Sequence, residues 1–197
     1  IGSGSEPGDN RAFGGSQTGQ GYSYIFLPNS GTQINNYLTD VQANIPSDNV
    51  ISLWAGGNDF LYGSANSDAI VANMESHIRQ LASAGAMEFI IPNVPPLEKT
   101  PEGLSRSQNE QNEIASEVTS YNEKLSNLIS NLSAELGINV HHIDAWTAFN
   151  DVVAHKEALG LTNVQESACS EGGGIIVSIF LPICDSGSTL VHNPDEY

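Results

Sequence analysis

The 197-residue sequence predicts an α/β fold, a three-layer α/β/α sandwich built around a parallel sheet. Two observations predict it. Short apolar segments of strand length alternate with segments whose apolar residues have the spacing of one helix face. This alternation is typical of parallel strands joined by right-handed helical crossovers, with helices on both faces of the sheet. We expect a single domain over residues 1–197.

The first helix and strand follow a glycine-rich opening segment. Pro46 ends a segment of helical spacing whose apolar residues are Ile34, Tyr37, Leu38, Val41 and Ile45. The next segment, Asn49-Val-Ile-Ser-Leu-Trp54, is predicted to be a buried strand. The strand then ends at the segment Ala55–Asp59, which contains two glycines followed by Asn58 and Asp59.

The second helix and strand have clearer boundaries. Asp68 stands where it could cap a helix that carries Ile70, Met74, Ile78 and Leu81, and Gly85 follows that helix. Residues 88–93 are predicted to form the second strand, which runs into the stiff Val94-Pro-Pro-Leu97 turn.

The third helix is the longest. Its apolar residues recur from Ile114 to Leu136, it begins near Ser107, and Gly137 ends it. Residues 138–143 form the third strand, and Asp144 is placed to cap a helix that reaches about Ala158.

The charge of the chain argues against several partners. Six Lys and Arg oppose 23 Asp and Glu, which gives a net charge of −17. Binding nucleic acid or an anionic membrane requires clustered cations, so we expect neither partner. No apolar stretch approaches the ~20 residues of a membrane span, so we expect no stable membrane insertion.

Two cysteines, Cys169 and Cys184, lie in the glycine-rich C-terminal stretch. An even cysteine count outside regular structure favours one disulfide and a secreted or extracellular location, the periplasm included. Two free thiols are the alternative.

The segment after the first strand carries the sharpest chemical signal. In open α/β sheets ligands bind beyond the carboxyl ends of the strands, where Asn58 stands after Gly56 and Gly57. Glycine lets the backbone approach a ligand closely, and a carboxamide can donate a hydrogen bond to an oxyanion. From local chemistry alone, an Asn-Asp turn that caps the next helix explains the same residues.

Five segments in order resemble the GDSL (SGNH) lipase/acylhydrolase family. They are Arg11-Ala-Phe-Gly-Gly-Ser-Gln-Thr18, Ala55-Gly-Gly-Asn-Asp59, Asn93-Val-Pro-Pro-Leu97, Tyr121-Asn-x-x-Leu125 and Asp144-Ala-Trp-x-x-Phe149. The resemblance implies a flavodoxin-like sandwich and a secreted ester hydrolase with a Ser-His-Asp mechanism and no cofactor. It also implies an oxyanion hole formed by the Asn58 side chain and the Gly14 backbone N–H.

The chain departs from the family at both ends. Neither the first block, Gly-Asp-Ser-Leu, nor the last, Asp-x-x-His, stands at its expected position. We therefore expect the nucleophile and the His-Asp pair to lie outside the given chain, and the domain to be incomplete at both ends. His192 precedes Asp195 with the wrong spacing and is interpreted as a surface residue.

The remaining candidates have structural alternatives. Aromatic and apolar residues near the strand ends could line an acyl pocket or pack in the core, and these are Trp54, Phe60, Tyr62 and Leu97. We expect a helix cap or turn bond from Asp59, solvated His77 and His155 on helices, and no metal site. A non-catalytic binding or interaction domain on the same fold is the second hypothesis. A flavodoxin-like nucleotide binder is disfavoured because the sequence lacks a phosphate loop.

Overall fold

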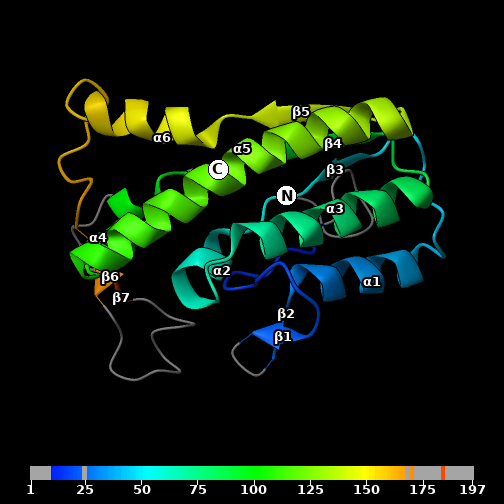
Figure 1. The fold of residues 1–197 in the computed structure, drawn as a ribbon, viewed down its shortest axis with the longest axis horizontal. Helices are drawn as coiled ribbons and strands as arrows, with labels where there is room; N and C mark the ends of the chain where they lie inside the picture. Colours follow the sequence, from blue (N-terminus) through cyan, green and yellow to red (C-terminus); the bar gives the residue numbers. More distant parts are fainter. Residues whose placement is uncertain (1–9, 24–25, 167–168, 171–182, 185–197) are drawn as a thin grey trace, which may run out of the picture.

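A computed structural model describes residues 10–23, 26–166, 169–170 and 183–184 (Figure 1). The helices are α1 (Ser30–Asp40), α2 (Gly57–Tyr62), α3 (Ser67–Ser83), α4 (Pro101–Leu104), α5 (Gln108–Leu136) and α6 (Ala145–Ala154). The strands are β1 (Tyr22–Ser23), β2 (Leu27–Pro28), β3 (Val50–Ser52), β4 (Glu88–Pro92), β5 (Asn139–Ile143), β6 (Cys169–Ser170) and β7 (Ile183–Cys184). A single 3₁₀ turn, Leu97–Lys99, precedes α4.

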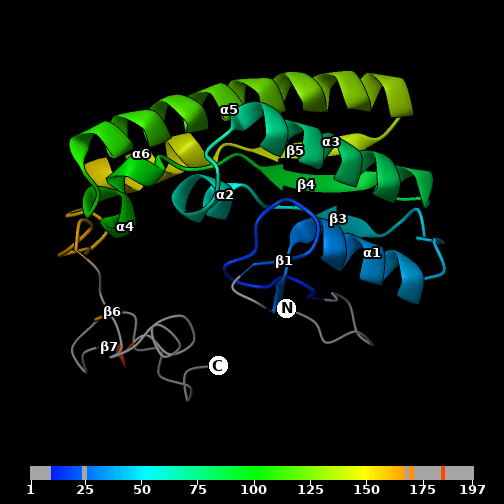
Figure 2. The same ribbon diagram turned by 60° about the horizontal axis from the view of Figure 1, so that its bottom comes forward.

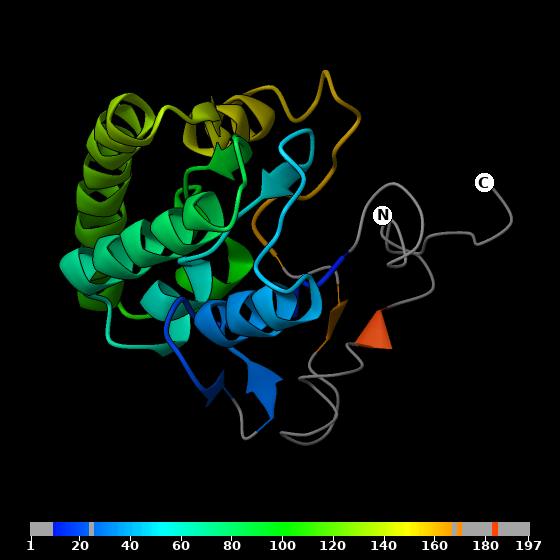
Figure 3. The same ribbon diagram turned by 90° about the vertical axis from the view of Figure 1, so that its right-hand side faces the viewer.

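The central sheet is parallel, with the strand order β3-β4-β5. Phe89 of β4 pairs in register with Ile51 of β3 and with Val140 of β5. Long helices α3 and α5 lie side by side over the sheet, as Figure 2 and the end-on view of Figure 3 show. The predicted α/β organisation with a parallel sheet is therefore confirmed.

The sheet presents two very different faces. Phe89 and Ile91 of β4 are fully buried in the core beneath α3 and α5. On the opposite face Val50 is 56% exposed and Ile143 is 48% exposed. The part of the chain that the structure describes therefore shows one covered face, and the second helical layer of the predicted sandwich is not seen in it.

Helix α5 forms where the sequence predicts it. Ser107 and Glu110 make a capping box, in which the Ser107 side chain accepts from the Glu110 N–H and the Glu110 side chain accepts from the Ser107 N–H. At the other end Gly137 adopts φ +66°, a left-handed conformation that glycine reaches without a steric penalty. Between these ends the buried side chains are Ile114, Val118, Tyr121, Leu125, Ile129 and Leu132.

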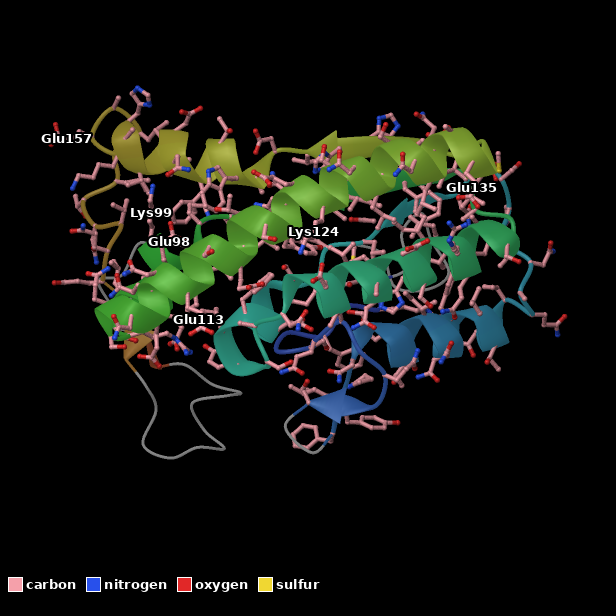
Figure 4. All side chains as sticks on the ribbon, viewed as in Figure 1. Glu98, Lys99, Glu113, Lys124, Glu135 and Glu157 are labelled. Carbon is pink, nitrogen blue, oxygen red and sulfur yellow. The ribbon has the colours of Figure 1, made fainter. Side chains whose placement is uncertain are left out.

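Ion pairs join α3 and α5 along their outer edges. Lys124 donates to Asp68 at 2.6 Å, and Arg79 donates to Glu135 at 2.7 Å (Figure 4 labels Lys124 and Glu135). Exposed pairs of this kind contribute about 0.2–1 kcal/mol each, so the buried apolar contacts between the helices dominate their packing.

Several predicted boundaries are wrong. Helix α1 ends at Asp40 rather than at Pro46, because Gln42 and Ala43 adopt positive φ. Helix α3 is capped by Asn66, whose side chain accepts from the Ala69 N–H, and not by Asp68.

Two further expectations need correction. Strand β3 is short, and Val50 and Ser52 are exposed, so it is not the buried strand expected over residues 49–54. Helix α6 ends at Ala154 rather than near Ala158.

The two cysteines occupy facing positions. Strands β6 and β7 pair antiparallel, and Cys169 lies opposite Cys184 in their register. This backbone arrangement supports the disulfide, which stays a prediction. In the described part of the chain, no helix combines the length and the apolar character that a bilayer crossing requires.

Candidate active site

Three strand ends meet at one edge of the sheet. Trp54, beyond β3, donates from Nε1 to the carbonyl oxygen of Asn93 at 3.1 Å. Asn93 follows β4 and donates from Nδ2 to Asp144 Oδ1, beyond β5, at 3.0 Å. The segments after β3, β4 and β5 are thus hydrogen-bonded to one another at the edge where α/β sheets bind ligands.

Asp144 is a helix cap, as predicted. Its carboxylate accepts from the Thr147 N–H in the first turn of α6. Hydrogen bonds from Thr147, and then from Asn93, lower the pKa of Asp144 below its ordinary value. The side chain is therefore ionised at neutral pH, and its Oδ1 links α6 to the segment after β4.

The turn between β3 and α2 requires glycine. Gly56 adopts φ +112°, which L side chains rarely adopt, and a Cβ there would lie 3.4 Å from Val94 Cγ2. Helix α2 begins at the next residue, so Asn58 sits in its first turn. The tight turn places the Asn58 carboxamide directly beyond the end of β3.

Asn58 reaches the loop that holds Gly14. Its Nδ2 donates to the backbone carbonyl of Ser16 at 2.9 Å. Gly14 is exposed two residues earlier in the same loop. The carboxamide has a second Nδ2 hydrogen, for which the described residues offer no partner. The structure therefore brings the two predicted oxyanion donors into adjoining segments.

Asp59 is bonded to the same loop. The Thr18 hydroxyl donates to Asp59 Oδ1 at 2.7 Å, and the Thr18 N–H donates to the same carboxylate at 3.0 Å. Burial raises the pKa of Asp59, while the hydrogen bonds from Thr18 lower it, and burial is the larger effect. Asp59 does not cap α2, since Gly56 is the N-cap residue and no side chain caps that helix.

His77 is buried, which contradicts the expectation of a solvated helix residue. It is 2% exposed, and its Nε2 lies 2.7 Å from the carbonyl oxygen of Thr18. Burial lowers the pKa of the ring below its ordinary value. Sequence reasoning also missed Thr18 and Asn73. Polar residues at an i, i+4 spacing beside the apolar face of α3, such as Asn73 and His77, were the available signal.

The other described histidines lie on β5 and at the end of α6. His141 and His142 point to opposite faces of β5, where His141 lies 3.2 Å from Glu88 Oε2. His155 is exposed at the end of α6. His192 and Asp195 lie outside the described residues. Within the described residues, no group of His, Cys, Asp and Glu side chains could hold a metal ion.

The four predicted acyl-pocket residues divide into two kinds. Trp54 is 61% exposed, and Tyr62 is also exposed. Phe60 packs edge-to-face against Tyr121 in the core, with 5.6 Å between ring centroids, and Leu97 is buried as well. The exposed pair can meet a ligand, whereas Phe60 and Leu97 fit the core-packing alternative that the sequence left open.

A hollow of about 370 Å³ lies beside the strand ends, between α5 and the start of α6. It is lined by Asn93, Thr119, Asn122, Glu123, Ser126, His142, Asp144, Trp146 and Thr147. Neither Asn58 nor Gly14 contributes to it. The two predicted oxyanion donors are therefore not part of the lining of this hollow.

The chain matches a model of the GDSL-like Lipase/Acylhydrolase family over residues 2–175. It is 27% identical over 146 residues to the thermolabile hemolysin of Vibrio parahaemolyticus. The matched segment covers 73% of this chain and 35% of the hemolysin. It is 23% identical over 171 residues to a GDSL esterase/lipase of Arabidopsis thaliana, with 75% and 45% of the two chains covered. A second such Arabidopsis protein is 24% identical over 177 residues, with 78% and 44% covered.

The chain spans less than half the length of each of these relatives. The family match, in contrast, extends over most of the chain, from the glycine-rich opening to the residues beyond α6. On this match, the chain belongs to the GDSL-like lipase/acylhydrolase family.

Proposed function

We propose that this chain supplies the oxyanion-binding part of an ester hydrolase, a lipase, esterase or acylhydrolase. The observation that carries the proposal is the hydrogen bond from Asn58 to Ser16, which holds the carboxamide against the Gly14 loop at the end of β3. A tetrahedral acyl intermediate requires hydrogen-bond donors that converge on its oxyanion, and we propose the Asn58 side chain and the Gly14 N–H for that role.

The proposed reaction is acyl transfer to a serine. A Ser hydroxyl attacks the ester carbonyl, a His takes its proton, and an Asp orients that His. Negative charge then develops on the carbonyl oxygen, where Asn58 Nδ2–H and the Gly14 N–H would donate to it. We place the Ser nucleophile and the His-Asp pair outside residues 1–197, in a longer natural protein. The mechanism requires no cofactor.

The proposed substrate is a small-molecule or lipid ester. Trp54 and Tyr62 are the exposed aromatic side chains near the strand ends and are our candidates for contact with the acyl chain. Phe60 and Leu97 would support this region from the core. In the natural protein we propose a complete three-layer sandwich, a Cys169–Cys184 disulfide and a secreted or extracellular location.

Hydrolysis of p-nitrophenyl esters by the protein of natural length tests this function. We expect turnover that added chelator does not change. In Trp54→Ala, we expect KM for an octanoate ester to rise about tenfold, which corresponds to 1.4 kcal/mol of lost apolar contact, within the range for a partly buried aromatic side chain. The acetate ester, whose acyl chain is too short for that contact, should keep its KM.

Trp54→Phe is the matched control, because it keeps an aromatic ring and loses the N–H that donates to Asn93. It should retain most of the affinity for octanoate. Equal losses on both esters, or on both variants, would assign Trp54 to structure. A natural-length protein that hydrolyses no ester would contradict the function and favour a non-catalytic binding domain.

A further inference from the structure

Residues Ser16 to Thr18 form a short segment whose backbone is bonded at every polar group. The Ser16 N–H donates to the Phe13 carbonyl, and the Ser16 carbonyl accepts from Asn58. The Gln17 N–H donates to Asn29 Oδ1, and the Gln17 carbonyl accepts from Ser30. Thr18 donates its N–H to Asp59, and its carbonyl lies against His77. An irregular loop segment with every group paired is held in one conformation.

Thr18 is the centre of these contacts, and its side chain is fully buried. Its hydroxyl donates to Asp59 Oδ1 at 2.7 Å and accepts from Asn73 Nδ2 at 3.0 Å. One hydroxyl thus joins α2, through Asp59, to α3, through Asn73. Such a chain of buried hydrogen bonds is strong where all its members are paired.

His77 lies on α3, as Asn73 does, and its ring contacts the Thr18 carbonyl oxygen. A carbonyl oxygen can only accept, so His77 Nε2 carries the hydrogen. In the neutral ring Nδ1 is then an acceptor, and it is buried without a hydrogen-bond partner in the described residues. Protonation would add a buried donor there with no acceptor, and burial already lowers the pKa of the ring. His77 is therefore a neutral donor.

Helix α3 is a rigid support for both side chains. Met74 and Ile78, next in sequence to Asn73 and His77, are fully buried in the core. The position of the Thr18 peptide is thus set by the packing of α3, and Asn58, next in sequence to Asp59, bonds to Ser16 in the same segment.

We infer that Asn73 and His77 are positioning residues that hold the oxyanion loop, from Gly14 to Thr18, against Asn58. The inference rests on the proposed function, because it assigns the loop a role in acyl transfer. Neither residue touches the substrate. A shift of about 1 Å in a donor can lower a rate by about 10²-fold, so loss of this support should lower kcat.

His77→Leu and His77→Gln separate positioning from packing. Leucine fills the buried position with an apolar side chain but donates no hydrogen bond to Thr18. The Nε2 amide of glutamine, in contrast, can donate from nearly the place of the His77 Nε2–H. In the natural-length protein, we expect His77→Leu to lower kcat at least tenfold with KM within twofold. His77→Gln should recover most of kcat. Asn73→Ala removes one hydrogen bond to the Thr18 hydroxyl and should lower kcat less than His77→Leu does. It tests the positioning role if His77→Leu fails to fold.

Ile78→Val is the control for lost stability, because it removes a buried methyl group from the residue next to His77 and removes no hydrogen bond to Thr18. It should lower the melting temperature and leave kcat unchanged. If His77→Leu also keeps its kcat, or if His77→Gln recovers none, the positioning role is overturned.

Hydrogen exchange of the Thr18 amide gives a readout that does not need catalysis. Protection should be high in the wild type and in His77→Gln and fall in His77→Leu. Equal protection in all three overturns the inference even if the protein hydrolyses no ester. If protection falls in His77→Leu while the wild type hydrolyses no ester, the hydrogen-bond network around Thr18 is supported. Only the proposed function is then contradicted.

Discussion

Asn58→Ala should lower kcat for ester hydrolysis by about 10²–10³-fold and leave KM nearly unchanged. The donated hydrogen bond strengthens as charge develops on the carbonyl oxygen, so its loss affects the transition state more than the bound ester. Steady-state kinetics with p-nitrophenyl acetate on the protein of natural length measure both constants.

Asn35→Ala is the matched control for this substitution. Asn35 is exposed on α1, and its Nδ2 donates to the side chain of Gln20 rather than to the loop backbone. Its kcat should stay within twofold of the wild type. An Asn58→Ala protein that keeps kcat within threefold would remove Asn58 from the oxyanion site.

Asp59→Ala should destabilise the folded protein by about 3 kcal/mol. The substitution leaves the buried Thr18 N–H and hydroxyl without their acceptor, and an unsatisfied buried donor typically costs about 1–3 kcal/mol. Asp59→Asn should cost about 1 kcal/mol, since one amide oxygen can still accept from Thr18. Urea denaturation gives both values. A loss below 1 kcal/mol in Asp59→Ala would mean that the loop does not depend on this carboxylate.

The same pair of proteins has an expected pH dependence. Burial raises the pKa of Asp59 in the folded state above its ordinary value of 3.8. Ionisation therefore disfavours the folded state as pH rises through the raised pKa. The stability advantage of the wild type over Asp59→Asn should be largest below pH 3.8 and shrink above it. An advantage that grows with pH would reverse the sign of the burial effect.

Local patterns explain which elements were predictable. The boundaries of α5 depend on Ser107 and Glu110 at one end and on Gly137 at the other, all within a few residues of the helix ends. The residues that predict strand β4 and the Asp144 cap likewise lie within or next to these elements in the sequence. The exposure of β3 is different, because the burial of a strand depends on what packs on it and not on its own apolar residues.

The site was predictable only in part. Gly56, Gly57 and Asn58 marked the strand end, since a tight turn there needs glycine. The network around Thr18 joins residues far apart in sequence: 42 positions separate Ser16 from Asn58, and 59 separate Thr18 from His77. Helical spacing assigns His77 to α3, but only the tertiary packing of the loop on that helix buries it.

Intact mass spectrometry before and after fluorophosphonate treatment tests the central claim most directly. On the protein of natural length, the account predicts one covalent adduct that forms much more slowly in Asn58→Ala, because the phosphonyl oxygen uses the same donors as an acyl oxyanion. Residues 1–197 alone should gain no adduct. A natural-length protein that stays unlabelled would contradict the assignment of this site to ester hydrolysis. Equal labelling rates in the wild type and in Asn58→Ala would contradict it as well.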